Sequence, residues 1–185
     1  MANLKKTVIL KKHDINEHIR RIAKEIAENN TSMEDVVLVG IRTGGAFLAM
    51  RLQEAMTKLN IPEPPTGVLD ITLYRDDWTR ISSTPIVGKT ELPFSIDNKT
   101  IILVDDVLFT GRTVRAAMDA LIDFGRPKKI ELAILADRGD GDRELPIKAN
   151  YVGGVWNISL HETINVYLKE SGFDDHVTIE ERRTV

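Results

Sequence analysis

Residues 101–113 have the sequence Ile-Ile-Leu-Val-Asp-Asp-Val-Leu-Phe-Thr-Gly-Arg-Thr, in which an apolar strand-like run leads to two acids and then to a turn that opens a helix. The first N–H groups of a helix lack partners and its dipole is positive there, so the turn over residues 110–113 suits a phosphate group. Gly111 lets the main chain approach such a ligand. Neighbouring side chains on a strand point to opposite sides, so Asp105 and Asp106 can take different roles towards sugar hydroxyls and Mg²⁺.

Hydrophobic periodicity predicts strands that alternate with helices around this segment. Strands are predicted over residues 36–41, 69–73, 100–104, 130–136, 151–156, 164–168 and 177–179, and helices over residues 15–28, 46–59 and 113–124. In the last of these helices, Val114, Met118, Leu121 and Ile122 are expected to face the core. Such alternation implies a largely parallel α/β sheet with helices on both faces, and ligands of such sheets bind at the carboxyl ends of the strands.

Length and composition indicate one globular domain over residues 1–185. The chain is 42% hydrophobic, and its formal net charge of -3 gives no overall basic field for nucleic acid. The absence of cysteine excludes disulfides and thiolate metal sites. We find no uncharged apolar stretch of about 18 residues that could span a bilayer. A cytoplasmic protein without a membrane partner is therefore expected.

Other common catalytic and nucleotide-binding motifs are missing from the sequence. Residues 40–58 contain no G-x-x-x-x-G-K-[ST], and residues 40–45 do not fit G-x-G-x-x-G, so P-loop and dinucleotide-binding sites are disfavoured. No catalytic triad or zinc spacing involves the four histidines, which are His13, His18, His161 and His176. The acids of residues 101–113 thus remain the main candidates for chemistry.

The segment 101–113 resembles, along its whole length, the motif with which type I phosphoribosyltransferases bind 5-phosphoribosyl-1-pyrophosphate (PRPP). Further stretches at residues 39–45, 70–77, 104–121 and 137–146 are similar to the PyrR family, whose members combine uracil phosphoribosyltransferase activity with control of pyrimidine operons. The similarity fades after Gly153. It implies the type I phosphoribosyltransferase fold, with a small hood formed by the N-terminal and C-terminal segments and a mobile loop at about residues 75–95.

The resemblance also assigns roles to particular residues. It implies catalytic roles for Arg75, Asp105 and Asp106. The two acids are also expected to engage the Mg²⁺ that binds together with PRPP. Uracil is expected beside Asp137 and Arg138. The implied PRPP site comprises Arg42, Thr43, Gly44, Asp105, Asp106, Val107, Leu108, Phe109, Thr110, Gly111, Arg112 and Thr113. Some relatives carry a second basic residue where Gly44 stands, so the affinity for pyrophosphate is expected to differ.

The implied activity is formation of UMP and pyrophosphate from uracil and PRPP in a homodimer or larger homo-oligomer. Because the PRPP motif does not specify the base, a purine-type phosphoribosyltransferase is the first alternative, although the regions 74–77 and 137–139 favour uracil. The second alternative is a regulator that mainly binds RNA and has weak catalysis. Residues 154–185 receive no functional assignment from the sequence.

A regulatory function would involve binding of pyrimidine-operon leader mRNA when UMP or UTP is bound. Arg20, Arg21 and Lys24 on the first helix, together with Arg143, are the candidate RNA contacts, although basic side chains on a helix are more commonly just solvated. Residues 140–142 form a longer and more acidic linker before Arg143 than is typical of RNA-binding members. Because negative charge there repels phosphate, catalysis is the favoured function.

Overall fold

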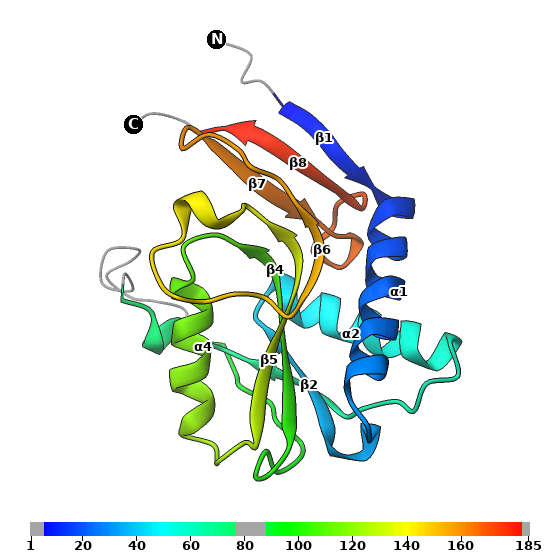
Figure 1. Ribbon diagram of the computed structural model, residues 1–185. Coiled ribbons are helices and arrows are strands. Elements are labelled where there is room, and N and C mark those ends of the chain that lie inside the picture. Colours follow the sequence, from blue (N-terminus) through cyan, green and yellow to red (C-terminus); the bar gives the residue numbers. More distant parts are fainter. Residues whose placement is uncertain (1–5, 77–87, 183–185) are drawn as a thin grey trace.

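A computed structural model describes residues 6–76 and 88–182 of the chain, which form two sheets and three helices among the described residues (Figure 1). The strands are β1 (Lys6–Lys11), β2 (Val36–Ile41), β3 (Thr66–Leu69), β4 (Thr100–Leu108), β5 (Lys129–Asp137), β6 (Tyr151–Val155), β7 (Glu162–Tyr167) and β8 (His176–Glu181). The helices are α1 (Lys12–Asn29), α2 (Gly44–Lys58) and α4 (Arg112–Ile122). None of the described helices is long and apolar enough to cross a membrane.

The larger sheet has five strands in the order β3-β2-β4-β5-β6, and every neighbouring pair is parallel. Its central strands β2 and β4 are apolar along most of their length because both of their faces are covered. The carboxyl ends of β2, β4 and β5 therefore meet at one edge of the sheet. The predicted parallel α/β architecture is confirmed.

Two apolar cores lie on the two faces of this sheet. Helices α1 and α2 pack on one face, against alternate strand residues such as Leu38 and Ile102. Helix α4 packs on the other face, against the intervening residues, which include Val39 and Leu103 (Figure 1). This division follows from the alternation of side chains along each strand, because successive residues of one strand point into different cores.

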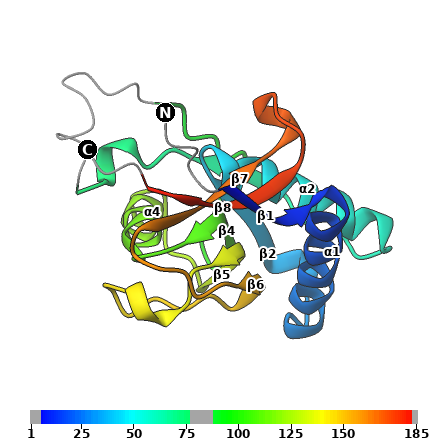
Figure 2. The same cartoon turned by 90° about the horizontal axis from the view of Figure 1, so that it is seen from above.

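A three-stranded antiparallel sheet of β1, β8 and β7 forms the small hood. Seen from above, its strands pass across the upper ends of the larger sheet, where β7 contacts β4 (Figure 2). The hood thus lies near the carboxyl ends of the strands that carry the candidate site. Its strand β1 was not predicted, because the short apolar run Val8–Leu10 shows no sustained period and is recognisable as a strand only by its pairing with β8.

Two details of the sequence prediction are wrong. The strand predicted over residues 69–73 ends at Leu69, because the Asp70 carboxylate accepts a hydrogen bond from the Thr72 N–H at 2.9 Å and the chain then forms a 3₁₀ turn over Thr72–Tyr74. Ile122, expected to face the core, is 65% exposed because α4 ends at this residue. Most of the predicted mobile loop, residues 77–87, lies outside the described residues.

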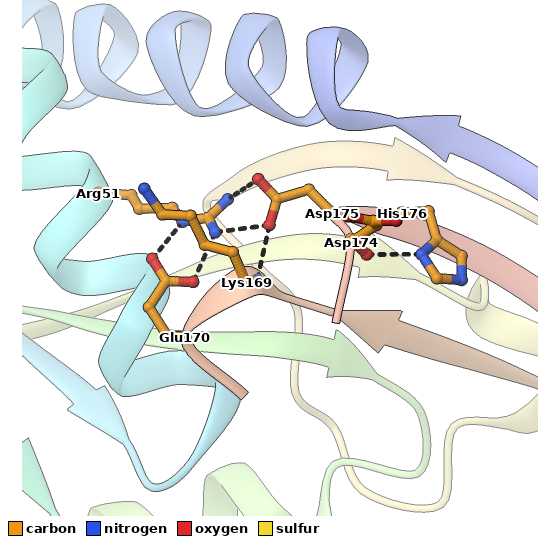
Figure 3. A network of polar contacts seen from close by, with 6 residues as sticks. All are labelled: Arg51, Lys169, Glu170, Asp174, Asp175 and His176. Carbon is orange, nitrogen blue, oxygen red and sulfur yellow. Dashed lines mark hydrogen bonds and ion pairs between the residues drawn. The ribbon is translucent and has the colours of Figure 1, made fainter. Parts of the chain in front are cut away.

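The hood is fastened to α2 by an ion-pair clamp made of Arg51, Glu170 and Asp175 (Figure 3). The Arg51 guanidinium donates to both Glu170 oxygens at 2.9 and 2.6 Å and to both Asp175 oxygens at 3.0 and 2.7 Å. Asp175 also accepts the Lys169 N–H at 2.8 Å. Hydrogen bonds from Arg51 hold the pKa of Glu170 below its ordinary value. The turn between β7 and β8 is thereby held against the helix that begins at the candidate pyrophosphate loop.

Candidate active site

The sheet brings most of the predicted site residues to one edge. Arg42 and Thr43 follow β2, the two acids lie near the end of β4, and Asp137 ends β5. The ends of β4 and β5 are joined by a hydrogen bond from the Arg138 N–H to the Leu108 carbonyl oxygen at 3.0 Å. Three segments that are distant in the sequence therefore meet where parallel sheets bind their ligands.

Asp105 and Asp106 lie within β4, which continues four residues beyond its predicted end at Val104. Asp105 is only 7% exposed, whereas Asp106 is half-buried. One Asp105 oxygen accepts the Asp106 N–H at 3.0 Å, and one Asp106 oxygen accepts the Val107 N–H at 2.8 Å. Burial raises the pKa of Asp105 well above its ordinary value, and the charge of Asp106 raises it further. Such a pair of acids favours a cationic or hydroxyl-bearing ligand, which would stabilise the ionised form.

The predicted phosphate cradle forms a cavity of about 250 Å³ at the start of α4. Gly111 precedes this helix with φ of 91°, a left-handed conformation that is costly for other residues. The Thr110 hydroxyl accepts a hydrogen bond from the Arg112 N–H at 3.4 Å. Residues 107–114 line the cavity together with Arg75 and Asp76. The structure thus places Arg75 at the same cavity as residues 107–114, which are candidate PRPP contacts.

The candidate pyrophosphate loop lies directly beside the acid pair. It contains a cis peptide bond between Arg42 and Thr43, and α2 begins at Gly44. A Cβ atom at Gly44 would overlap the carboxylate of Asp106, so glycine permits the helix start to approach this acid closely. The Arg42 side chain donates to the Lys89 carbonyl oxygen at 2.8 Å. The start of α2, whose first N–H groups have no acceptor within the helix, and the half-buried Asp106 are consequently neighbours.

The segment 143–147 supports the cradle, a role that sequence reasoning did not identify. The N–H groups of Glu144 and Leu145 donate to the Thr110 carbonyl oxygen at 3.1 and 3.2 Å, and Arg112 forms an ion pair with Glu144. Arg143 donates to the Phe109 carbonyl oxygen and, at 2.7 Å, to Asp137. The Arg-Glu-Leu-Pro run at residues 143–146 was the available signal, but its partners are set only by the tertiary fold.

At the predicted uracil position, Asp137 and Arg138 are both buried, with exposures of 7% and 3%. The Asp137 carboxylate accepts hydrogen bonds from the Gly139 N–H at 2.8 Å and from Arg143. The Arg138 guanidinium lies 3.8 Å from the ring centroid of Phe109, which belongs to the segment 101–113. Asp137 is therefore engaged within the chain, while Arg138 joins the candidate base position to the candidate PRPP site.

The candidate RNA contacts have different surroundings. Arg20, Arg21 and Lys24 are exposed on α1. However, Arg21 donates to the Val152 and Gly153 carbonyl oxygens at 2.9 and 2.5 Å, so part of its guanidinium is occupied. The Arg143 side chain is only 8% exposed and paired with Asp137. RNA binding by these four residues stays a prediction, and for Arg143 it would require rearrangement.

The acid pair fits Mg²⁺ that arrives with a phosphate-bearing substrate. Among the described residues, no three histidine, cysteine, aspartate or glutamate side chains are grouped to hold a metal ion by themselves. Mg²⁺ is commonly bound by one or two carboxylates together with water and substrate phosphates. Asp105 and Asp106 would supply such carboxylates beside the cradle.

Comparison with known proteins identifies the family. The family model "Phosphoribosyl transferase domain" matches residues 7–166. A "Bifunctional protein PyrR" from Desulfosudis oleivorans is 51% identical over 175 residues, which cover 95% of this chain and 96% of that protein. Another from Clostridioides difficile is 52% identical over 163 residues, which cover 88% of this chain and 91% of that protein. These relatives are similar to the chain over nearly their whole length.

Solved structures of low sequence identity share the fold. A hypoxanthine phosphoribosyltransferase from Staphylococcus aureus superposes with a TM-score of 0.66 at 24% identity, covering 89% of this chain and 84% of that one. A mutant hypoxanthine phosphoribosyltransferase from Trypanosoma cruzi, in a ternary substrates complex, superposes with a TM-score of 0.71 at 19% identity. The match covers 97% of this chain and 96% of that one. These structures agree with the fold, while the family model and the curated relatives show that the chain belongs to the PyrR family of phosphoribosyl transferase domain proteins.

Proposed function

We propose that the chain is a uracil phosphoribosyltransferase that converts uracil and PRPP into UMP and pyrophosphate. The observation that carries this proposal is the juxtaposition of the buried Asp105 and half-buried Asp106 with the 250 Å³ cradle at the start of α4. The cradle suits the 5-phosphate of PRPP, and the turn over residues 42–44 suits its pyrophosphate. The acids lie between these two anion sites along the sheet edge, where the ribose of PRPP would be.

In the proposed reaction a uracil nitrogen loses its proton to water and forms a bond to C1 of the ribose, while the bond from C1 to pyrophosphate breaks and the electron pair leaves with pyrophosphate. The transition state has cationic ribose character, which the carboxylates of Asp105 and Asp106 would stabilise. The Thr110 and Thr113 hydroxyls and nearby N–H groups hold the 5-phosphate, and Arg75 lies at the same cavity. Mg²⁺ bound with PRPP would neutralise charge on the leaving pyrophosphate. No covalent enzyme intermediate is needed.

Arg138 is the proposed contact to the base. Its buried Nε–H has no hydrogen-bond partner among the described residues, and an unsatisfied buried donor is costly. A carbonyl oxygen of uracil would satisfy such a donor. Because Arg138 is only 3% exposed, the side chains that cover it must move aside when the base binds. Cytosine presents an amino group in place of one of these carbonyls, so a site that donates at that position disfavours it.

Release of pyrophosphate from PRPP and Mg²⁺ with each candidate base tests the proposed activity. We expect turnover with uracil at least about 100-fold faster than with hypoxanthine or guanine, because hydrogen-bond matching discriminates strongly at a buried site. Omitting Mg²⁺ should remove activity with every base. Faster turnover with a purine would instead establish the purine-type alternative, and absence of pyrophosphate release with all bases would contradict the enzyme proposal.

A second proposed function is UMP-dependent binding of pyrimidine-operon leader RNA through the exposed face of α1. The relatives from Desulfosudis oleivorans and Clostridioides difficile are named as bifunctional proteins. On this chain, Arg20 and Lys24 are exposed with no ion pair identified among the described residues. Their guanidinium and ammonium groups can contact phosphates without first breaking a bond within the chain.

RNA binding is tested by electrophoretic mobility shift with the leader RNA, with and without UMP. We expect UMP to strengthen binding, and each neutralised phosphate contact to contribute about 0.7 to 0.9 to the slope of log affinity against log salt. Arg20→Gln with Lys24→Gln should therefore reduce this slope by about 1.5. The matched control is Arg115→Gln, which removes a cation that is paired with Asp119 on α4, the helix on the other face of the sheet. Binding that is absent or insensitive to UMP and salt would contradict this function.

A further inference from the structure

Asp142, in the acidic linker after Gly139, lies beside the candidate base site. Residues Asp140–Asp142 form a 3₁₀ turn immediately after β5. The Asp142 carboxylate accepts a hydrogen bond from Nη2 of Arg138 at 3.0 Å. The two side chains are 2% and 16% exposed, so this ion pair is largely shielded from solvent. An acid that the sequence suggested as repulsive towards RNA instead contacts the proposed uracil-binding residue.

The remaining contacts of Arg138 leave its orientation dependent on this pair. Its Nη2 also donates to the Ser159 carbonyl oxygen at a longer 3.3 Å, and its guanidinium lies over the Phe109 ring. A flat guanidinium can rotate within the plane of an aromatic ring, so stacking alone does not fix the direction of its N–H groups. A carboxylate at one edge does fix that direction, because charge-assisted hydrogen bonds are directional and strong.

We infer that Asp142 is a positioning residue that orients Arg138 on Phe109, so that Arg138 donates to a carbonyl oxygen of the bound pyrimidine. Asp142 itself does not contact the base. This inference rests on the proposed function, since it assigns Arg138 to the base. It also gives one acid of this linker a part in base binding.

The same turn offers a matched control. Asp140 has the same charge and lies two residues from Asp142. Its side chain is 92% exposed, and its one ion-pair contact among the described residues is a long one, at 4.0 Å from Arg143. Asp140→Asn changes the net charge of the turn exactly as Asp142→Asn does. A difference between the two variants therefore does not come from the net charge of the turn, and it reports on the buried surroundings of Asp142, where Arg138 is its ion-pair partner.

Steady-state kinetics of Asp142→Asn, Asp142→Glu and Asp140→Asn provide the first readout. We expect Asp142→Asn to raise the KM for uracil by about tenfold, with kcat and the KM for PRPP changed by less than about twofold, because base binding alone loses an oriented donor. Asp142→Glu should recover most of the loss, and Asp140→Asn should match the wild type. An unchanged KM for uracil, or equal increases for uracil and PRPP, would overturn the inference. If Asp142→Asn does not fold, Asp142→Ser takes its place, because it also removes the carboxylate that contacts Arg138. The same rise in the KM for uracil is expected for it, and an unchanged KM would overturn the inference.

The second readout does not depend on activity. In ¹⁵N-labelled full-length protein, the Arg138 Nε–H resonance should move in Asp142→Asn and remain in place in Asp140→Asn. A resonance that is unmoved in Asp142→Asn would show that the ion pair does not orient Arg138, whatever the kinetics. Conversely, the resonance could move in Asp142→Asn although the wild-type protein has no activity on uracil. That result would support the ion pair between Asp142 and Arg138 and would contradict the proposed function instead.

Discussion

Replacing Asp105 and Asp106 together with asparagine should lower kcat with uracil and PRPP by at least about 1000-fold while leaving the fold intact. Removal of one group that stabilises transition-state charge typically costs a factor of about 100 to 1000. Here both carboxylates beside the proposed ribose position are lost at once. Asparagine retains the side-chain oxygens that accept the Asp106 and Val107 N–H groups, so the local structure should persist.

Pyrophosphate release measured alongside circular dichroism separates loss of chemistry from loss of structure. Asp119→Asn is the matched control, because Asp119 is an exposed acid on α4 that pairs only with Arg115 four residues away in the described structure. This control should retain activity within about twofold, as expected for an exposed ion pair. Near-normal turnover in the double variant would refute the catalytic assignment of the two acids.

Arg51→Ala is expected to lower the free energy of unfolding by about 3 kcal/mol, because it breaks a buried ion pair by removing one partner. The Arg51 and Asp175 side chains are 10% and 3% exposed, so the substitution leaves a buried carboxylate without its partner. Glu170, at 22% exposure, is more easily solvated and should contribute less. Because the clamp joins α2 to the turn between β7 and β8, the hood should loosen first.

Urea denaturation measures this loss, and hydrogen exchange locates it. Arg115→Ala serves as the control, since Arg115 is 43% exposed and such helix pairs contribute only about 0.3 to 0.5 kcal/mol. Exchange should accelerate in β7 and β8 more than in β2. A change below about 1 kcal/mol for Arg51→Ala would mean that the clamp adds little to the attachment of the hood.

The central sheet and its helices were predictable because their signals are local. The apolar run 36–41 became β2 with the same bounds, and the stripes of α1 and α2 were found to within a few residues. The sequence also located the acids and the small-residue turn, since a strand followed by a helix places both at one sheet edge. What periodicity cannot give is pairing between distant segments.

The missed features all depend on such distant contacts. Strand β1 exists because it pairs with β8 at the opposite end of the described chain, and the Arg51 clamp joins positions more than a hundred residues apart. In the segment 143–147, backbone N–H groups donate hydrogen bonds to the Thr110 carbonyl oxygen. The identity of the side chains does not reveal such backbone contacts. The sequence likewise does not distinguish Asp142 from an exposed acid, because its contact with Arg138 forms only in the folded chain.

The most direct test of the catalytic assignment is a crystal structure of the protein with PRPP and Mg²⁺. The account predicts the 5-phosphate against the N–H groups and hydroxyls of residues 110–113, the ribose beside Asp105 and Asp106, and the pyrophosphate at residues 42–44. PRPP bound elsewhere, or a cradle without phosphate at saturating PRPP, would contradict the assignment of this sheet edge as the active site.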